Sequence, residues 1–297
     1  MKNIIIVLIS LILTGSVFAD ELNVVTTYPY IASIVEQVGK DKVNVFALAK
    51  GEWDPHTIIP KPSFIAKLRK ADILILNGAQ LEIGWLPPLM RQANNPKIQV
   101  GTPGILDLSK HVELIEVPAA ISRAQGDVHP DGNPHFHLDF TNIPKIATAI
   151  AHKLSEIDPV NKTTYEQNNN AFLEKFYQKE KEWTAALEKL KGTKVIEYHK
   201  NYDYLLRRVG LQLVGTIEPV PGISPTSRHI ETLEKIISSN DVKYILQDVY
   251  HPDDASKYLS SKHKIKMIII PHDIGSVSNT NNIFEFYDEI VRRLIGD

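Results

Sequence analysis

An alternation of short apolar runs with helical segments, interrupted once by a long helical stretch, constrains the fold of this chain most strongly. The apolar runs are short and rich in β-branched residues, which is typical of buried strands. They lie at 22–26, 43–48, 73–76, 194–198, 211–217, 244–246 and 266–270. Segments of helical period separate them, at 29–38, 62–70, 82–92, 143–157, 201–209, 226–239, 252–261 and 284–295. This alternation predicts parallel βαβ units.

The long helical stretch covers residues 162–190 and contains no Gly or Pro. At 1.5 Å per residue it would extend about 40 Å, enough to run along a whole domain. Because the alternation resumes directly after it, we predict a connecting helix within 159–191. It would join an N-terminal lobe at 20–158 to a C-terminal lobe at 192–297. The predicted fold class is therefore α/β, with two lobes that each contain a mainly parallel sheet flanked by helices.

The N-terminus has the features of a secretory signal at residues 1–19. Lys2 provides the positive charge, 4–13 form the apolar run, and Val17-Phe18-Ala19 is a small-residue cleavage site. The apolar run is too short to span a bilayer, and no later stretch reaches the roughly 18 apolar residues that spanning requires. We therefore expect cleavage near Ala19 and a periplasmic protein.

Composition narrows the classes of function. The chain has no Cys, which excludes disulfides, thiolate ligands, a Cys nucleophile and a lipid on an N-terminal Cys. Without Lys2, 32 Lys and Arg residues stand against 35 acidic residues, for a formal charge of −3. No basic cluster with interleaved aromatics is present, so nucleic acid is not an expected partner. We expect a monomer that binds a small molecule or an ion.

Histidines follow several of the predicted strands. His56 follows the run at 43–48, His199 ends the run at 194–198, and His272-Asp273 follows the run at 266–270. In open α/β sheets, ligands bind beyond the carboxyl ends of the strands. Neutral imidazole is a preferred ligand of zinc and of neighbouring transition metals. The cleft between the lobes is therefore the expected place for a metal site.

A fourth position comes from the loop at 117–140, which has Gly and Pro but no sustained apolar period. Loops of this length in compact domains are usually functional or disordered. This loop contains Asn133-Pro134-His135, which matches Asp54-Pro55-His56 in pattern. A preceding Pro stiffens the backbone that aims each imidazole. We expect His135 to bind the same ion as His56 and His199.

The remaining ligand is open between two adjacent residues. His272 would complete an all-nitrogen site that favours zinc, whereas Asp273 would supply negative charge and suit manganese better. Neighbours on an extended segment face opposite ways, so we expect only one of them to bind. Glu52 is an alternative ligand or a supporting carboxylate. The expected cargo is Zn²⁺, with Mn²⁺ as the alternative.

The other histidines have simpler interpretations. His152 lies on a helix whose apolar face is already occupied, and we expect it at the surface or at the edge of the core. Solvated positions are expected for His111, His229, His251 and His263. His129 and His137 share the loop of His135, and short His-rich tracts often capture metal loosely. We expect transient binding or spare coordination from these two.

Taken together, the motifs resemble the periplasmic metal-binding receptors of zinc and manganese ABC importers, in the cluster with a rigid connecting helix. The resemblance runs from Thr26-Thr27-Tyr28-Pro29 to the final helix. It is carried by Trp53-Asp54-Pro55-His56, Asn133-Pro134-His135-Phe136-His137, Glu197-Tyr198-His199 and the segment from Glu218-Pro219 to Pro225. His137 stands where the family commonly has Trp. The fourth family ligand is an Asp shortly before a Leu-Gly or Met-Gly pair, and alignment on Gly275 places His272 at that position.

The resemblance implies a binding protein without catalysis, which delivers its ion to a membrane permease driven by a cytoplasmic ATPase. One alternative is a secreted zinc hydrolase with three His ligands, a bound water, and Glu52 or Glu197 as general base. Neither a His-Glu-x-x-His helix nor a Ser-based nucleophile elbow is present to favour it. An adhesin or a receptor for a non-metal solute is a further alternative.

Overall fold

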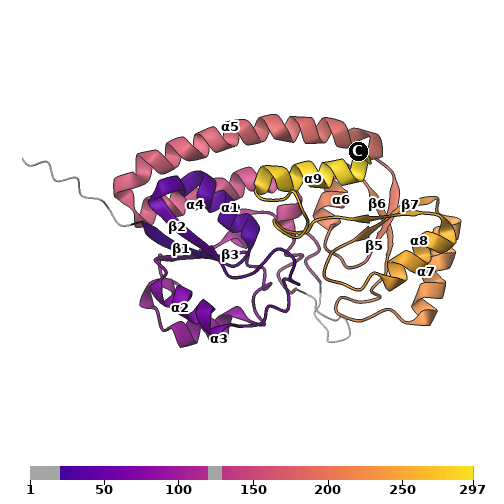
Figure 1. The fold of residues 1–297 in the computed structure, drawn as a ribbon, viewed down its shortest axis with the longest axis horizontal. Coiled ribbons are helices and arrows are strands. Elements are labelled where there is room, and N and C mark those ends of the chain that lie inside the picture. The colour runs from indigo at the N-terminus through magenta and orange to yellow at the C-terminus, as the bar shows by residue number, and fades with distance from the viewer. Residues whose placement is uncertain (1–20, 120–128, 297) are drawn as a thin grey trace, which may run out of the picture.

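The computed structural model describes residues 21–119 and 129–296, so the expected signal at 1–19 and the middle of the loop at 117–140 lie outside the described residues. Two separate four-stranded sheets form the two halves of the protein (Figure 1). The strands of the first sheet are β1 (Leu22–Thr26), β2 (Val43–Ala47), β3 (Ile73–Leu76) and β4 (Ile105–Asp107). Those of the second are β5 (Lys194–Glu197), β6 (Gln212–Thr216), β7 (Val242–Gln247) and β8 (Lys266–Ile269).

Both sheets have the same topology. Their strand orders are β2-β1-β3-β4 and β6-β5-β7-β8, and every pair is parallel. In each sheet the second strand lies on one side of the first strand, and the third and fourth strands lie on the other side. This arrangement creates a topological switch point between β1 and β3 and between β5 and β7. Loops that leave the carboxyl ends of strands at such a point form the usual binding crevice of open α/β sheets.

Helices flank the sheets and connect the strands. They are α1 (Pro29–Gly39), α2 (Pro62–Lys70), α3 (Leu86–Ala93), α4 (Ile143–Ile157), α5 (Lys162–Leu187), α6 (Asp203–Val209), α7 (Ser227–Ser239), α8 (Asp254–His263) and α9 (Ile283–Ile295). Four of them begin with Pro in the first turn, where the missing N–H has no intrahelical partner to lose. The predicted fold class of two α/β lobes is confirmed.

Helix α5 runs above both sheets and ends above the second, as Figure 1 shows. Its 26 residues correspond to a length of about 39 Å. The helix packs on α1 and α4 of the first half and on α9. Its buried aromatic side chains Phe172, Phe176 and Trp183 meet Phe284 and Tyr287 of α9, and the Trp183 indole N–H donates to Asp288 at 2.8 Å. The long helix is thus fixed along its length by packing.

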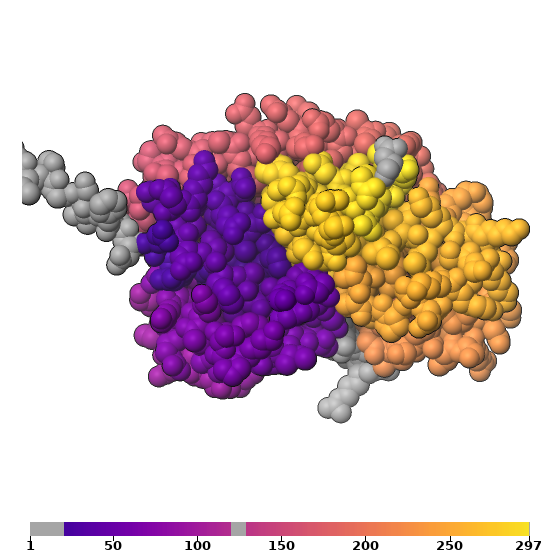
Figure 2. Space-filling model, in the orientation of Figure 1, coloured from indigo at the N-terminus to yellow at the C-terminus, as the bar shows by residue number. Residues whose placement is uncertain are grey.

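The C-terminal segment returns to the first half of the protein. The backbone N–H of Ile283 donates to Ser33 Oγ at 3.1 Å, and the Tyr287 hydroxyl donates to the backbone oxygen of His137. In Figure 2 the C-terminal surface lies directly against the N-terminal surface. Because α9 packs on α1, α5 and β8, it links the two halves.

Two local features differ from the sequence-based expectation. Strand β4 has three residues, too few to produce a recognisable period. The helix expected at 82–92 begins only at Leu86, because Ala79 and Gln80 adopt positive φ values and the chain makes turns before Trp85. Within the described part of the chain, no helix combines the length and apolar character needed to cross a membrane.

Candidate metal centre

The loop after β2 holds His56 through a local carboxylate. Asp54 Oδ1 accepts hydrogen bonds from the backbone N–H and from Nδ1 of His56, each at 2.9 Å. Burial raises the pKa of Asp54, but hydrogen bonds from His56 and Thr57 and the charge of His56 outweigh that effect and lower it overall. Because Nδ1 keeps its proton and donates it to the carboxylate in this hydrogen bond, Nε2 of the neutral His56 ring is the nitrogen that can bind a metal.

This loop lies against the C-terminal half. A Cβ on Gly51 would stand 1.9 Å from the backbone oxygen of Ile274, a contact that no side chain could make. A glycine is therefore required where the loop meets residues 274–276. The close approach places His56 at the seam between the halves rather than on an outer surface.

His135 comes from the second Pro-His motif. Its backbone N–H donates to Asn133 Oδ1 at 3.0 Å, and the side chain is buried. Asn133 is in turn held by the C-terminal half, because its backbone oxygen accepts from the Tyr204 hydroxyl at 2.9 Å. Its side-chain amide also donates to the backbone oxygen of Lys200 at 3.2 Å. The position of His135 therefore depends on contacts with both halves.

His199 follows β5 and is oriented by Glu218, which follows β6. Nδ1 of His199 donates to Glu218 Oε2 at 2.6 Å, and both side chains are buried. On its other side Glu218 meets Nε2 of His251 at 3.4 Å, and Nδ1 of His251 binds Asp248 at 2.8 Å. A carboxylate on the far nitrogen of a ligating imidazole fixes the ring and raises its basicity. Glu218 has this role for His199, as Asp54 has for His56.

The three imidazoles converge at one place. Ligand nitrogens of His56, His135 and His199 lie within 4.8 Å of one another. The ring centroids are 5.3 Å apart for His56 and His135, 5.2 Å for His56 and His199, and 6.1 Å for His135 and His199. In a tetrahedral zinc shell neighbouring nitrogens are about 3.4 Å apart, so small inward movements would complete the contacts.

Burial favours the neutral form of two of these imidazoles. Burial lowers the pKa of His135 well below its ordinary value, and the charges of His56 and His199 lower it further. The pKa of His199 is also lowered, again chiefly by burial, although the Glu218 hydrogen bond opposes that effect. Neutral imidazole is the form that binds a metal. Both rings are therefore available at neutral pH without an ion to displace their protons.

His272 and Asp273, the two candidates for the fourth ligand, do not join this group. His272 Nε2 donates to the backbone oxygen of Trp53 at 3.2 Å, and its ring packs on Tyr250. Asp273 Oδ1 accepts from the backbone N–H groups of Tyr30 at 2.8 Å and Ile274 at 2.6 Å. Tyr30 lies in the first turn of α1, where an N–H without an intrahelical partner attracts a carboxylate. In this structure both residues therefore contact backbone groups, although Nδ1 of His272 has no hydrogen-bond partner among the described residues.

The other candidate ligands, His137, Glu52 and His129, differ in their surroundings. His137 is buried between Tyr30, at a ring distance of 4.3 Å, and Phe286, and its Nε2 donates to the backbone oxygen of His272 at 2.8 Å. It therefore serves as a core side chain. Glu52 is half exposed and lies 3.8 Å from the Lys50 ammonium. His129, in contrast, has its ring centroid 5.3 Å from that of His56.

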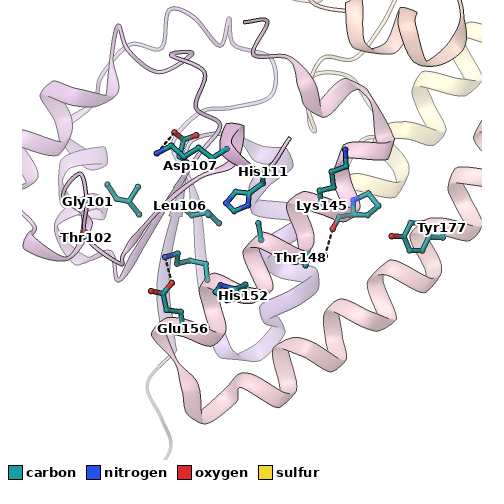
Figure 3. A pocket seen from close by; sticks show the side chains of 15 residues that line it. Gly101, Thr102, Leu106, Asp107, His111, Lys145, Thr148, His152, Glu156 and Tyr177 are labelled. Atoms are coloured by element: carbon teal, nitrogen blue, oxygen red, sulfur yellow. Dashed lines mark hydrogen bonds and ion pairs between the residues drawn. The ribbon is translucent and has the colours of Figure 1, made fainter. Parts of the chain in front are cut away.

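A separate pocket lies in the first half of the protein. A cavity of about 970 Å³ opens between β4, α4 and α5, and Figure 3 shows His111 and His152 among the side chains that line it. Its lining includes none of the three converging imidazoles. Both His111 and His152 are thus remote from the candidate metal centre, in agreement with their expected surface positions.

The metal centre is bordered by ionic contacts between the halves. Lys200, next to His199, forms an ion pair with Glu116 of the first half and lies 3.7 Å from Asp203. Asn133 adds hydrogen bonds to Glu116 Oε2 at 3.1 Å and to Asp203 Oδ2 at 3.3 Å. We call these four residues the interlobe latch. It connects the segments that carry His135 and His199.

The sequence profile of the family described as "ZnuA: Zinc-uptake complex component A periplasmic" matches residues 24–295. The chain belongs to this family.

Curated relatives of this ZnuA-family chain include receptors named for zinc and for manganese. It is 26% identical over 248 residues to the zinc-binding lipoprotein AdcA of Streptococcus pneumoniae, covering 81% of this chain and 47% of AdcA. It is 26% identical over 230 residues to the high-affinity zinc uptake system protein ZnuA of Bacillus subtilis, covering 76% and 70%. The manganese ABC transporter substrate-binding lipoprotein PsaA of Streptococcus pneumoniae is 28% identical over 220 residues, covering 72% and 68%. The chain spans about half the length of the first of these relatives.

Solved structures show the same fold. A crystal structure of ZnuA superimposes with a TM-score of 0.78 at 23% identity, covering 93% of this ZnuA-family chain and 99% of that one. A Mn-bound periplasmic metal-binding protein from candidatus liberibacter asiaticus gives a TM-score of 0.75 at 19% identity, with the same coverage. The two-lobed architecture with its long helix is therefore the architecture of this family.

Proposed function

We propose that this chain is an extracytoplasmic receptor that binds a divalent transition metal ion, zinc in preference to manganese, and delivers it to the permease of an ABC importer. The observation that carries the proposal is the convergence of His56, His135 and His199, from three distant segments, within 4.8 Å at the seam of two lobes. Relatives named as manganese ABC transporter substrate-binding lipoproteins, and one named as a high-affinity zinc uptake system protein, support the transport role.

The donor set favours zinc. The three converging ligands are imidazoles, and a borderline metal such as zinc accepts nitrogen more readily than manganese, which prefers carboxylate and water oxygen. The carboxylates nearest to them, Asp54 and Glu218, are hydrogen-bonded to the far nitrogens of two of the rings. They compensate the charge of the ion without binding it directly.

Neither general base expected for the hydrolase alternative lies with the three converging imidazoles. The side chain of Glu52 is about half exposed and faces Lys50. Glu197 is fully buried, and its Oε2 accepts a hydrogen bond from the backbone N–H of Tyr202 at 3.1 Å. Burial raises the pKa of Glu197 well above its ordinary value. Neither carboxylate is among the described residues that group around His56, His135 and His199.

The proposal is tested by the zinc affinity of single variants. Competition with a chromophoric chelator measures the Kd for zinc in the wild type and in His56→Ala, His199→Ala and His152→Ala. We expect His56→Ala and His199→Ala each to weaken binding by more than the roughly 10–100-fold that loss of a ligand's hydrogen-bond partner costs. His152, which lines the remote pocket, is the matched control and leaves affinity unchanged. Equal affinity in all four proteins would remove the site assignment.

A further inference from the structure

The three converging imidazoles leave a tetrahedral zinc shell one ligand short. A closed zinc site has four protein ligands, whereas a catalytic site keeps one position open for water or substrate. A receptor without catalysis is expected to have the closed arrangement. His272 and Asp273 are bound to the backbone of Trp53, Tyr30 and Ile274. Neither residue belongs to the group whose ligand atoms converge, so we looked for the fourth ligand among the other side chains at the seam.

His129 is placed to supply that ligand. Its ring centroid lies 5.3 Å from that of His56, the same separation as between His56 and His135. Its Nε2 is shielded from solvent and has no hydrogen-bond partner among the described residues. A buried nitrogen without a partner is costly unless something else binds it, and a metal ion would satisfy it.

A turn ties His129 to the segment of His135. The backbone N–H of Gly132 donates to the backbone oxygen of His129 at 3.1 Å, and that of Asn133 donates to the backbone oxygen of Ile115 at 2.9 Å. Gly132 adopts φ +115°, and a Cβ there would stand 2.8 Å from the Ile115 oxygen. This position therefore needs glycine, and the turn brings His129 to the same side of the seam as His135.

The charge balance does not require a carboxylate as fourth ligand. Asp54 and Glu218, on the far nitrogens of His56 and His199, supply two negative charges beside the ion. Those charges match the two positive charges of zinc. A neutral fourth ligand then leaves the buried centre near neutrality, whereas an additional buried carboxylate would leave net negative charge in a poorly solvated place.

We propose that His129 is the fourth ligand, so that the centre is a four-imidazole zinc site built from His56, His129, His135 and His199. The inference rests on the proposed function. The nitrogens of the other three lie within 4.8 Å of one another, a spacing that His129 does not meet with all of them. The His129 ring therefore swings inward about its side-chain bonds when the ion binds.

X-ray absorption spectroscopy of the zinc-loaded full chain, with zinc affinity measured by chelator competition, tests this assignment. The wild type is expected to show four imidazole ligands. His129→Ala is expected to show three imidazoles and one oxygen ligand, with affinity weakened by at least the roughly 10–100-fold typical of a lost ligand partner. His111→Ala, in the remote pocket, is the control and retains four imidazoles. Three imidazoles in the wild type, or an unchanged spectrum in His129→Ala, would overturn the assignment.

A second variant keeps the test independent of folding defects. His129→Asp restores a fourth ligand with an oxygen donor, and we expect it to recover tighter metal binding than His129→Ala while improving manganese relative to zinc. If His129→Asp leaves the preference between manganese and zinc unchanged, that result would count against His129 as a ligand. If His56→Ala and His199→Ala weaken binding but neither His129 variant does, only this inference fails. If none of these variants has an effect, the proposed function fails as well.

Discussion

At the scale of residues, the protein distinguishes histidines of the same sequence neighbourhood by what surrounds each ring. His135 lies in the converging group, whereas His137, two residues later, stacks on Tyr30 and fills the core. His272, which sequence alignment on Gly275 places at the family's fourth ligand, donates to Trp53. Burial is common to all three, so the direction of the ring nitrogens decides their roles.

His272 provides a prediction about pH. Burial lowers its pKa to about 4, although Asp248, Asp54 and the Trp53 carbonyl oppose that effect. The unfolded chain takes up a proton near the ordinary pKa of 6.5, whereas the folded chain does so only near 4. The stabilising contribution of the neutral ring is therefore complete above pH 6.5 and is lost as pH falls from 6.5 towards 4.

His272→Gln retains a donor for the Trp53 oxygen but cannot titrate. From pH 7 to pH 5, the metal-free wild type is expected to lose on the order of 2 kcal/mol more unfolding free energy than the variant. Urea unfolding at the two pH values measures the difference. Other buried imidazoles contribute equally in both proteins. An equal loss of unfolding free energy in the wild type and in His272→Gln would therefore show that His272 does not titrate in this way. Because His272 lies outside the converging group, zinc affinity should be unchanged.

At the scale of elements, α5 is held by aromatic packing rather than by its intrinsic helix propensity. Phe176 is fully buried, with ring centroids of Phe172, Trp183, Phe284 and Tyr287 within 6.0 Å. These contacts join α5 to α9. A long helix whose buried face is continuous with a second helix behaves as a rigid strut, because bending it would open a densely packed interior.

Phe176→Ala should therefore destabilise the protein by about 3–5 kcal/mol, through lost burial and the cavity left behind. The neighbouring Tyr177 is 48% exposed, and Tyr177→Ala should change the unfolding free energy by no more than about 0.5 kcal/mol. Urea unfolding midpoints of Phe176→Ala and Tyr177→Ala, measured under the same conditions, test this difference in stability. Similar midpoints would mean that α5 is held by other contacts.

At the scale of the whole molecule, the metal centre is a junction between lobes. The three converging imidazoles come from both halves. The interlobe latch of Glu116, Asn133, Lys200 and Asp203 connects the segments that carry His135 and His199. Because α5 restrains large changes in the angle between lobes, movement of the ligand loops is the simplest route for release of the ion. The latch would then limit how readily those loops part.

Lys200→Met is expected to speed zinc release by roughly fivefold, or about 1 kcal/mol, because it removes the ion pairs to Glu116 and Asp203. The ion pair is about one-third exposed, so a larger effect is not expected. Stopped-flow transfer of zinc to a chelator measures the rate. Lys243→Met, which loses only a local pair with Asp241, is the control and should match the wild type. A faster rate in both variants would assign the effect to surface charge in general.

The sequence by itself determined the two α/β lobes, the connecting helix and the grouping of His56, His135 and His199. These features depend on local periodicity and on the rule that strand ends share one edge, so they are readable without tertiary contacts. The pairing of His199 with Glu218 was harder to predict, since the two residues are 19 positions apart and approach only because β5 and β6 are neighbours.

Tertiary structure decided the surroundings of the candidates for the fourth ligand. Asp273 caps the first turn of α1, 243 positions away in the sequence, and His272 is fixed by Trp53. The positions of His272 and Asp273 in the sequence do not reveal which distant backbone groups these side chains contact. Those groups are supplied by long-range packing, which also brings α9 back onto the first half. The same packing leaves a buried ring nitrogen of His129 without a partner beside His56, because the turn that positions it closes against Ile115.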